Sequence, residues 1–239
     1  ALSGMRASMD SQRVIASNMA NANTLGFRAE MLDQRAVTIE GQPNEARAMQ
    51  TARVRGANMA AGEIVQTGRD LDIAMATDAL MAVQATDGTE AYTRRGDLSI
   101  SATGLLVNGE GLPVLGDTGP ITIPPTGFPA IAPDGTITLA DPATPDQPPA
   151  EIGRIKLAAW QGSPISKGLD GLFRVEGGGI LPTDEAATVT VGAVEGSNVK
   201  TTEVLVEMID AQRLFAMRSK VIATAREIDE SGAQLMRLG

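Results

Sequence analysis

The sequence predicts an α+β protein in which long N- and C-terminal helices form an antiparallel, coiled-coil-like pair, with a mainly antiparallel β domain in the middle. Two observations predict this division. Of the 26 glycines, 21 lie between Gly56 and Gly196, and ten of the 13 prolines lie between Pro113 and Pro149. Glycine and proline interrupt helices and populate turns, so both ends of the chain can be helical and the middle cannot.

The N-terminal segment, residues 1–27, carries side chains at alternating spacings of three and four, which places them in one stripe on a helix. The members are Leu2, Met5, Met9, Gln12, Ala16 and Met19. Asn and Gly tolerate left-handed backbone, so the run from Asn21 to Gly26 is expected to end this helix, and Phe27 to anchor the exit.

The C-terminal segment, residues 196–239, carries a comparable stripe. Its members are Leu205, Met208, Ile209, Phe215, Ile222, Ala225 and Ile228. A helix over residues 201–238 would be about 50 Å long at ~1.5 Å per residue. Each stripe needs an apolar partner, which is either the other terminus or a neighbouring molecule. Periodicity alone leaves both open, and a self-contained helical hairpin would satisfy it.

The middle segment, residues 64–195, is expected to be a compact antiparallel β domain. Turn dipeptides typical of hairpins occur at Asp87-Gly88, Asn108-Gly109 and Asp134-Gly135. The strands are expected at residues 80–84, 90–94, 98–101, 105–107, 136–139, 155–160, 172–175 and 189–193. The proline-rich run 141–149 is expected to be an exposed loop. Residues 28–63 are polar with weak periodicity, which indicates a linker that becomes ordered on assembly.

Composition excludes several classes of function. The chain has no Cys and no His, which removes thiol nucleophiles, Cys/His zinc sites and the commonest general base. A net charge of −9 without a basic run opposes nucleic-acid binding. No segment reaches the ~18 apolar residues of a membrane span. We therefore expect no catalytic, cofactor-binding or metal-binding residues, no nucleic-acid partner and no membrane insertion.

One alternative class is an envelope module that binds or acts on glycans. It would need converging carboxylates or exposed aromatic side chains. The candidates are Asp70 and Asp72, with Tyr92 and Trp160 as the aromatic groups. No neighbouring group would separate the pKa values of the two carboxylates, and solvated turn positions account for them equally well.

Several motifs, in a fixed order, resemble the family of flagellar rod and hook proteins. The first is Ser17-Asn-Met-Ala-Asn-Ala-Asn-Thr-Leu-Gly-Phe-Arg28, which is similar to the family's N-terminal signature. Ser17 stands where the family usually has Asn, and Arg28 where it has Lys. Residues 67–74 and 87–97 resemble the opening of the family's β domain, and residues 196–199 and 207–215 its C-terminal block.

The resemblance implies a structural rod subunit that polymerises through its terminal helices. The block 104–116, which ends in Pro-Val-Leu-Gly, and the following residues 119–124 are similar to the proximal-rod member, with the distal-rod member as the alternative. The assembly interface implied comprises Leu2, Met5, Met9, Ile15, Asn18, Met19, Asn21, Gly26, Phe27, Leu205, Met208, Ile209, Gln212, Phe215 and Ile222.

The same resemblance implies the partners and the location. The partners are other copies of the chain, other flagellar rod proteins, surrounding ring proteins and, in transit, the flagellar type III export apparatus. Residues 1–22 lack the continuous apolar core of a secretory signal peptide, which agrees with that route. The expected location is the periplasmic rod of the flagellar basal body.

Overall fold

The computed structural model describes residues 2–38, 48–143 and 146–237. These residues form two units. The first, called here the terminal unit, comprises residues 1–21, 30–56 and 199–239, and the second, the β unit, comprises residues 22–29 and 57–198. Each unit is therefore discontinuous in sequence, because the chain enters and leaves the β unit twice.

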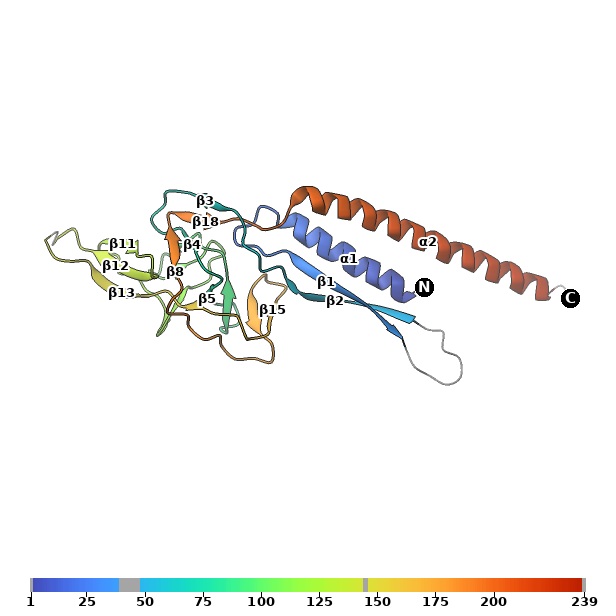
Figure 1. The fold of residues 1–239 in the computed structure, drawn as a ribbon, viewed down its shortest axis with the longest axis horizontal. Helices are drawn as coiled ribbons and strands as arrows, with labels where there is room; N and C mark the ends of the chain where they lie inside the picture. Colours follow the sequence, from blue (N-terminus) through green and yellow to red (C-terminus); the bar gives the residue numbers. More distant parts are fainter. Residues whose placement is uncertain (1, 39–47, 144–145, 238–239) are drawn as a thin grey trace. The chain divides into compact units, whose positions relative to one another are not determined.

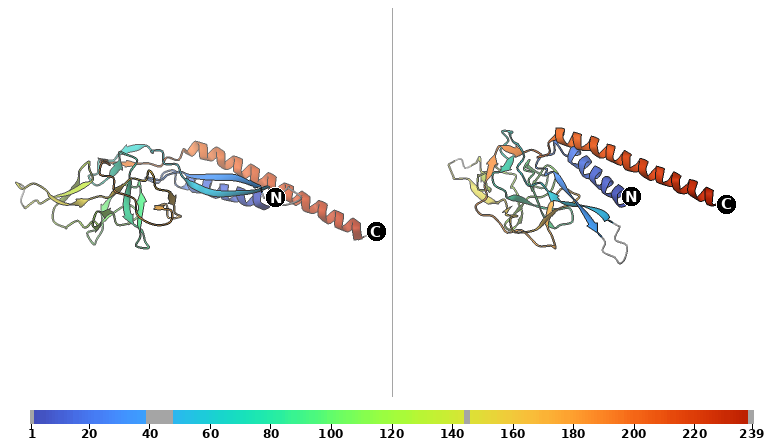
Figure 2. Two further views of the ribbon diagram at one scale, coloured as in Figure 1. Left: turned by 60° about the horizontal axis from the view of Figure 1, so that its bottom comes forward. Right: turned by 45° about the vertical axis from the view of Figure 1, so that its right-hand side comes forward.

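The terminal unit contains two helices and a two-stranded sheet (Figure 1). The helices are α1 (Leu2–Ala20) and α2 (Thr201–Arg237), and the sheet pairs β1 (Glu30–Thr38) with β2 (Ala48–Ala57). Helix α1 contacts both α2 and β1, and it lies beside α2 in both views of Figure 2. Neither described helix is long and apolar enough to cross a membrane.

The predicted fold class is wrong in its helical part. Helix α1 has only 19 residues against the 37 of α2, so the described residues contain no long N-terminal helix that could form a coiled-coil pair. Two faces of α1 are buried instead of one seam: Ala7, Val14 and Asn18 share the face that meets β1, and Ile15 lies on the side of α2. Strand β1 supplies the second partner, and sequence periodicity predicted neither β1 nor its partner strand β2.

Strands β1 and β2 lie within residues 28–63, which the sequence analysis assigned to a linker. Residues 39–47 of that segment lie outside the described residues. Ordering on assembly stays a prediction, as do the four domain boundaries. In the proline-rich run 141–149, all described residues are exposed.

The β unit is antiparallel throughout its described strand pairs. A five-stranded sheet has the order β14 (Leu157–Ala158), β5 (Leu80–Gln84), β6 (Glu90–Thr93), β16 (Phe173–Val175) and β15 (Ile165–Lys167). A three-stranded sheet has the order β11 (Phe128–Ile131), β12 (Thr136–Ala140) and β13 (Ala150–Arg154).

Four two-stranded pairs complete the described part of the unit. They are β3 (Ile64–Gln66) with β18 (Ala193–Glu195), β4 (Ile73–Met75) with β17 (Val189–Val191), β7 (Ser99–Ile100) with β8 (Leu106–Val107), and β9 (Leu115–Gly116) with β10 (Gly119–Pro120).

Strand β5 separates two apolar clusters. Met81 and Val83 face the larger cluster, which is aliphatic, whereas Leu80 and Ala82 face a smaller cluster that holds Tyr92 and Phe173. Successive side chains of a strand point to opposite faces, so a strand buried on both sides is a continuous apolar run. This accounts for the Leu-Met-Ala-Val sequence, and all four side chains are fully buried.

Candidate assembly surface

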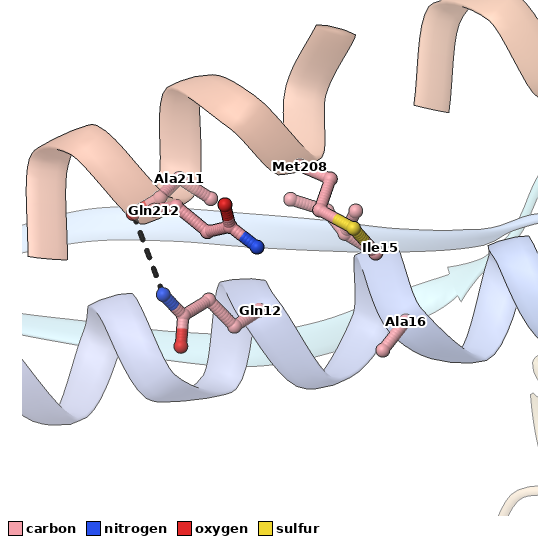
Figure 3. Close-up of a pocket in the computed structure, with 6 residues that line it drawn as sticks. All are labelled: Gln12, Ile15, Ala16, Met208, Ala211 and Gln212. Atoms are coloured by element: carbon pink, nitrogen blue, oxygen red, sulfur yellow. Dashed lines mark hydrogen bonds between the residues drawn. The ribbon is translucent and has the colours of Figure 1, made fainter. Parts of the chain in front are cut away.

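Helices α1 and α2 run antiparallel in the terminal unit and meet through few polar contacts. Gln12 Nε2 donates to the carbonyl oxygen of Ala211 over 3.4 Å (Figure 3). Closer to the start of α1, the Arg218 guanidinium donates to Ser8 Oγ. The earlier residue of α1 (Ser8) therefore pairs with the later residue of α2 (Arg218), which shows that the two helices are antiparallel.

A cleft remains open between the two helices. It has a volume of about 190 Å³ and is lined by Gln12, Ile15, Ala16, Met208, Ala211 and Gln212 (Figure 3). Four of these six side chains are apolar. The helices therefore do not fill the space between them with their own side chains.

Three of the apolar residues predicted for the assembly interface do not line this cleft and are exposed to solvent. Met9 is 57% exposed, Leu205 42% and Ile209 50%. Met9 precedes Gln12 by three residues, and Ile209 precedes Gln212 by three, so each shares a helix face with a cleft residue. Of the other predicted positions, Ile15 is buried, Gln212 is exposed, and the half-buried ones are Met5, Met19, Met208, Phe215 and Ile222. The side chain of Leu2 lies outside the described residues.

A second apolar surface on α2 was not predicted. It consists of Leu214, Met217, Val221 and Ile228, here called the outer stripe, with exposed fractions of 45%, 65%, 65% and 66%. Only Ile228 belonged to the predicted stripe. These residues are three, four and seven positions apart, which places them on one face of the helix. This spacing is the feature of the sequence from which the outer stripe could have been predicted.

Asn18 and Asn21 of the signature act within the terminal unit. Asn18 Oδ1 accepts from Glu30 N at 2.7 Å, and its Nδ2 donates to Glu30 O at 3.0 Å, so one side chain pairs with the strand as another strand would. Asn21 Nδ2 donates to the carbonyl oxygen of Ser17 at 2.9 Å. These contacts end α1 and hold the start of β1 against it.

Gly26 and Phe27 lie buried in the β unit. Gly26 has a φ of 67°, and a Cβ added there would lie 2.4 Å from the carbonyl carbon of Arg94. Its N–H donates to the carbonyl oxygen of Glu195 at 2.7 Å. The Nζ atom of Lys167 lies 3.3 Å from the centroid of the Phe27 ring. Glycine is thus required at position 26 both by its backbone conformation and by the close approach.

Arg28, the last signature residue, belongs to a buried cluster of charged side chains centred on Glu195. Arg28 Nη1 lies 2.6 Å from Glu195 Oε1, and Arg94 Nη2 lies 2.6 Å from Oε2, with all three side chains at most 4% exposed. Arg94 also donates to the carbonyl oxygens of Met75, Thr77 and Ala79. Burial lowers the pKa of the Arg94 guanidinium, and the adjacent Glu195 carboxylate opposes that shift.

Asn198 joins three separate stretches of the β unit. Its Oδ1 accepts from Ala29 N at 2.7 Å, and its Nδ2 donates to the carbonyl oxygens of Asn58 and Ala60 at 2.7 and 2.8 Å. Glu195 and Asn198 together tie residues 26–29 to the end of the unit. Glu195 was not singled out by the sequence, and Asn198 was singled out only as part of the motif at residues 196–199, without a role.

The residues considered for a metal-binding or glycan-binding site differ in character and in burial. The described residues contain no group of three or more Asp, Glu, Cys or His side chains that could hold a metal ion. Asp72 is buried and accepts from Thr67 Oγ1 at 2.7 Å, whereas Asp70 is exposed. Tyr92 is fully buried, and its hydroxyl donates to Glu90 Oε1, so the ring is not a glycan platform. Burial, with this hydrogen bond, raises the pKa of Tyr92.

Comparison with known protein families gives two matches. Residues 74–139 match the family described as the flagellar hook protein FlgE/F/G D1 domain, and residues 190–235 match the flagellar basal body rod FlgEFG protein C-terminal family.

Curated relatives match over almost the whole chain. The sequence is 40% identical over 236 residues to the flagellar basal-body rod protein FlgF of Salmonella typhimurium, covering 96% of this chain and 94% of that protein. It is 39% identical to FlgF of Escherichia coli with the same coverage. It is also 32% identical over 256 residues to the rod protein FlgG of Agrobacterium fabrum, covering 95% of this chain and 94% of that protein.

Proposed function

Because this chain belongs to the family of flagellar basal-body rod proteins, we propose that it is a structural subunit of the rod, in the proximal, FlgF-like position. The identity of 40% over 96% of the chain carries this proposal. The two relatives with 39% and 40% identity are both FlgF proteins, which supports the FlgF-like position over the distal-rod alternative, although the FlgF of Caulobacter vibrioides and the FlgG of Agrobacterium fabrum are both 32% identical. The partners in this role are other copies of the chain and other rod proteins.

The terminal unit is the part of the chain suited to assembly. It carries exposed apolar side chains on both helices and an open cleft between them. In water such surfaces are stabilised by burial against another molecule at roughly 25 cal/mol per Å². The fifteen positions predicted for the interface divide accordingly: exposed ones such as Met9 and Ile209 can meet a neighbour, whereas Gly26 and Phe27 hold the β unit together.

Export through the flagellar type III apparatus, assembly in the periplasm and contact with surrounding ring proteins belong to the same proposal. They are supported by family membership alone. The glycan-binding alternative is disfavoured, since Asp72 and Tyr92 are buried and Trp160 is half-buried, which leaves only Asp70 exposed among its candidates.

The test is replacement of the gene in the organism that encodes it. Cells without the gene are expected to lack complete basal bodies and to be non-motile, and a copy tagged in the exposed loop 141–143 is expected to restore both. The tag should then be located on the rod in electron micrographs of isolated basal bodies. Complete basal bodies and normal swimming without the gene would refute the proposal.

A further inference from the structure

Strand β3 of the β unit is paired along one edge. Its partner is β18 (Figure 1), and among the described strands no other pairs with β3. The far edge of β18 is covered, because the Glu195 carbonyl oxygen accepts a hydrogen bond from Gly26 N at 2.7 Å. The open edge of this two-stranded sheet therefore belongs to β3.

The register of the pair shows which backbone groups reach the open edge. The Glu63 carbonyl oxygen accepts a hydrogen bond from Gly196 N at 2.8 Å, so Glu63 directs its carbonyl group toward β18 and the residue that follows it. The backbone groups of an antiparallel strand alternate in direction from one residue to the next. Ile64 and Gln66 therefore direct their N–H and C=O groups away from β18, where a further strand can pair with them.

The side chains of β3 leave this edge unprotected. Ile64 is 48% exposed and Val65 49%, and since successive residues of a strand point to opposite faces, both faces of β3 are open to solvent. Proline and charged residues on an outer strand oppose pairing with another strand. Such residues occur in the outer strands of the larger sheets: Pro129 in β11, Glu151 in β13 and Lys167 in β15. Strand β3, with the sequence Ile-Val-Gln, has none.

The charges on either side of β3 indicate what covers the edge. Glu63 precedes the strand and is exposed, and Arg69 follows it with a side chain that is 60% exposed. Asp70 lies in the turn that is closed by a hydrogen bond from Asp72 N to the Arg69 carbonyl oxygen. When two β3 strands lie antiparallel, the Glu63 end of each meets the Arg69 end of the other. The edge is therefore complementary in charge to a second copy of itself.

We infer that the open edge of β3 pairs with β3 of a second copy of this chain, antiparallel and about a two-fold axis at Val65. Ile64 of each copy then pairs with Gln66 of the other, and the two members of each such pair exchange both N–H···O bonds. The contact joins the two β3–β18 pairs into one sheet, and wider sheets are more stable than two-stranded ones.

This contact is isologous, so it closes as a dimer and does not extend into a filament. It is a property of the free chain and is independent of the proposed function.

Single cysteine variants test the register, because the chain has no cysteine of its own. In the inferred dimer Val65 lies directly opposite Val65 of the second copy, with Cα atoms about 4.5 Å apart, a separation that a disulfide spans. The purified Val65→Cys variant is therefore expected to form a covalent dimer on mild oxidation with oxidised glutathione.

Two neighbouring positions are matched controls. The Cα atoms of Gln66 in the two copies are diagonal neighbours about 7–8 Å apart, as are those of Ile64, which is beyond the ~7 Å limit for a disulfide. Ile64→Cys and Gln66→Cys are thus expected to stay monomeric when oxidised separately. A mixture of the two is expected to form a dimer, because these positions pair directly at about 5.5 Å.

Sedimentation of the wild-type chain over a range of concentrations measures the dimer without a cross-link. Val65→Lys places like charges directly opposite each other and should weaken dimerisation by about tenfold. An unchanged midpoint in urea unfolding would show that the variant folds. A wild-type dimer that persists in Val65→Lys would overturn the inference, as would equal cross-linking of all three cysteine variants or a wild-type chain that is monomeric throughout. Each of these results leaves the proposed function intact, since gene replacement tests that separately.

Discussion

The β unit and the terminal unit differ in how far their large apolar side chains are buried. In the β unit the large apolar side chains form two buried clusters, and the exposed ones, such as Leu169 and Phe128, are isolated apart from the neighbours Ile64 and Val65 in β3. In the terminal unit, exposed apolar residues follow one another along α2. Scattered exposed apolar residues are normal on a protein surface, whereas contiguous ones indicate an interaction site. The β unit thus buries most of its large apolar side chains, whereas α2 exposes a series of them, which we expect to be an interaction surface.

The charged groups show the same contrast. In the β unit, Arg28, Arg94 and Glu195 are buried and paired with one another. In the terminal unit, the ion pair of Lys200 with Glu203 lies in solvent, where such pairs contribute about 0–1 kcal/mol. Mutations in the two units should therefore have different consequences: loss of stability in the β unit and loss of assembly in the terminal unit.

The largest expected effect is the loss of assembly from Met9→Asp or Phe215→Asp. A carboxylate on a surface that is desolvated in the rod would be buried without a partner, so incorporation and swimming should be abolished. The unfolding free energy of the β unit should change by less than about 0.5 kcal/mol. Leu169→Asp is the matched control, because Leu169 is fully exposed on a turn of the β unit. Normal swimming of the Met9→Asp strain would contradict the contrast between the units.

The next effect in size is destabilisation of the β unit by Glu195→Ala. Removing the carboxylate leaves two buried guanidinium groups without their counter-charge, at an expected cost of about 3–5 kcal/mol. Urea unfolding of the purified chain measures it. Glu110→Ala breaks the exposed pair with Arg95 and should cost no more than about 1 kcal/mol. A similar loss of unfolding free energy in the two variants would show that the buried ion pairs of Glu195 contribute no more to stability than the exposed pair of Glu110.

Gly26→Ala should destabilise the β unit by about 2–4 kcal/mol, which combines left-handed backbone strain with displacement of the Arg94 carbonyl group. Gly88→Ala separates the two causes. Gly88 has a φ of 82° and no heavy atom within 4 Å of an added Cβ, so only strain of about 1–2 kcal/mol applies. Equal midpoints in urea unfolding for the two variants would disprove the close approach at Gly26.

The smallest effect is that of pH. The hydrogen bond from Arg174 lowers the pKa of Asp170, so its folded-state pKa lies below the unfolded value of about 3.9. The stability it contributes is present above that value and is lost as the pH falls through the folded-state pKa. Tyr92 behaves oppositely: its raised pKa contributes stability below pH ~10 that is lost at higher pH.

Since the chain has no histidine, the unfolding free energy should be flat between about pH 6 and 9 and fall at both ends. Urea unfolding at a series of pH values measures this profile. In the Asp170→Asn variant, the unfolding free energy should fall less steeply at acidic pH. A step near pH ~6.5, the ordinary pKa of histidine, would be incompatible with this account.

Local signals in the sequence predicted local structure well. The strand expected at residues 80–84 is β5, because a short run of apolar residues bounded by turns is typical of a strand buried on both faces. The helix expected over residues 201–238 is α2. Strands β1 and β2 were missed since sequences such as Glu-Met-Leu-Asp-Gln-Arg have no alternation of apolar and polar residues. The coiled-coil prediction failed for the same reason, because β1 occupies one face of α1.

The assembly interface stays a prediction. Spacing along the sequence predicts two stripes, one with Met9 and one with Leu205 and Ile209, although spacing does not say whether a stripe is covered. Of the outer stripe only Ile228 was predicted, because the charged residues Arg218, Lys220 and Glu227 lie between its members along the sequence. The roles of Glu195 and Asn198 could not be predicted, since the partners of Asn198 lie up to 169 residues away. Only the folded chain brings such residues together.

The anchoring of residues 26–29 by Glu195 and Asn198 has a consequence for the order of folding. A chain that emerges from its N-terminus exposes these residues first, yet their partners appear only after more than 160 further residues. Contacts so distant in sequence carry a large loop-closure entropy and form late. Residues 26–29 therefore lack their native contacts until nearly the whole β unit has emerged. The β unit can complete its fold only after its last strand, β18, is available.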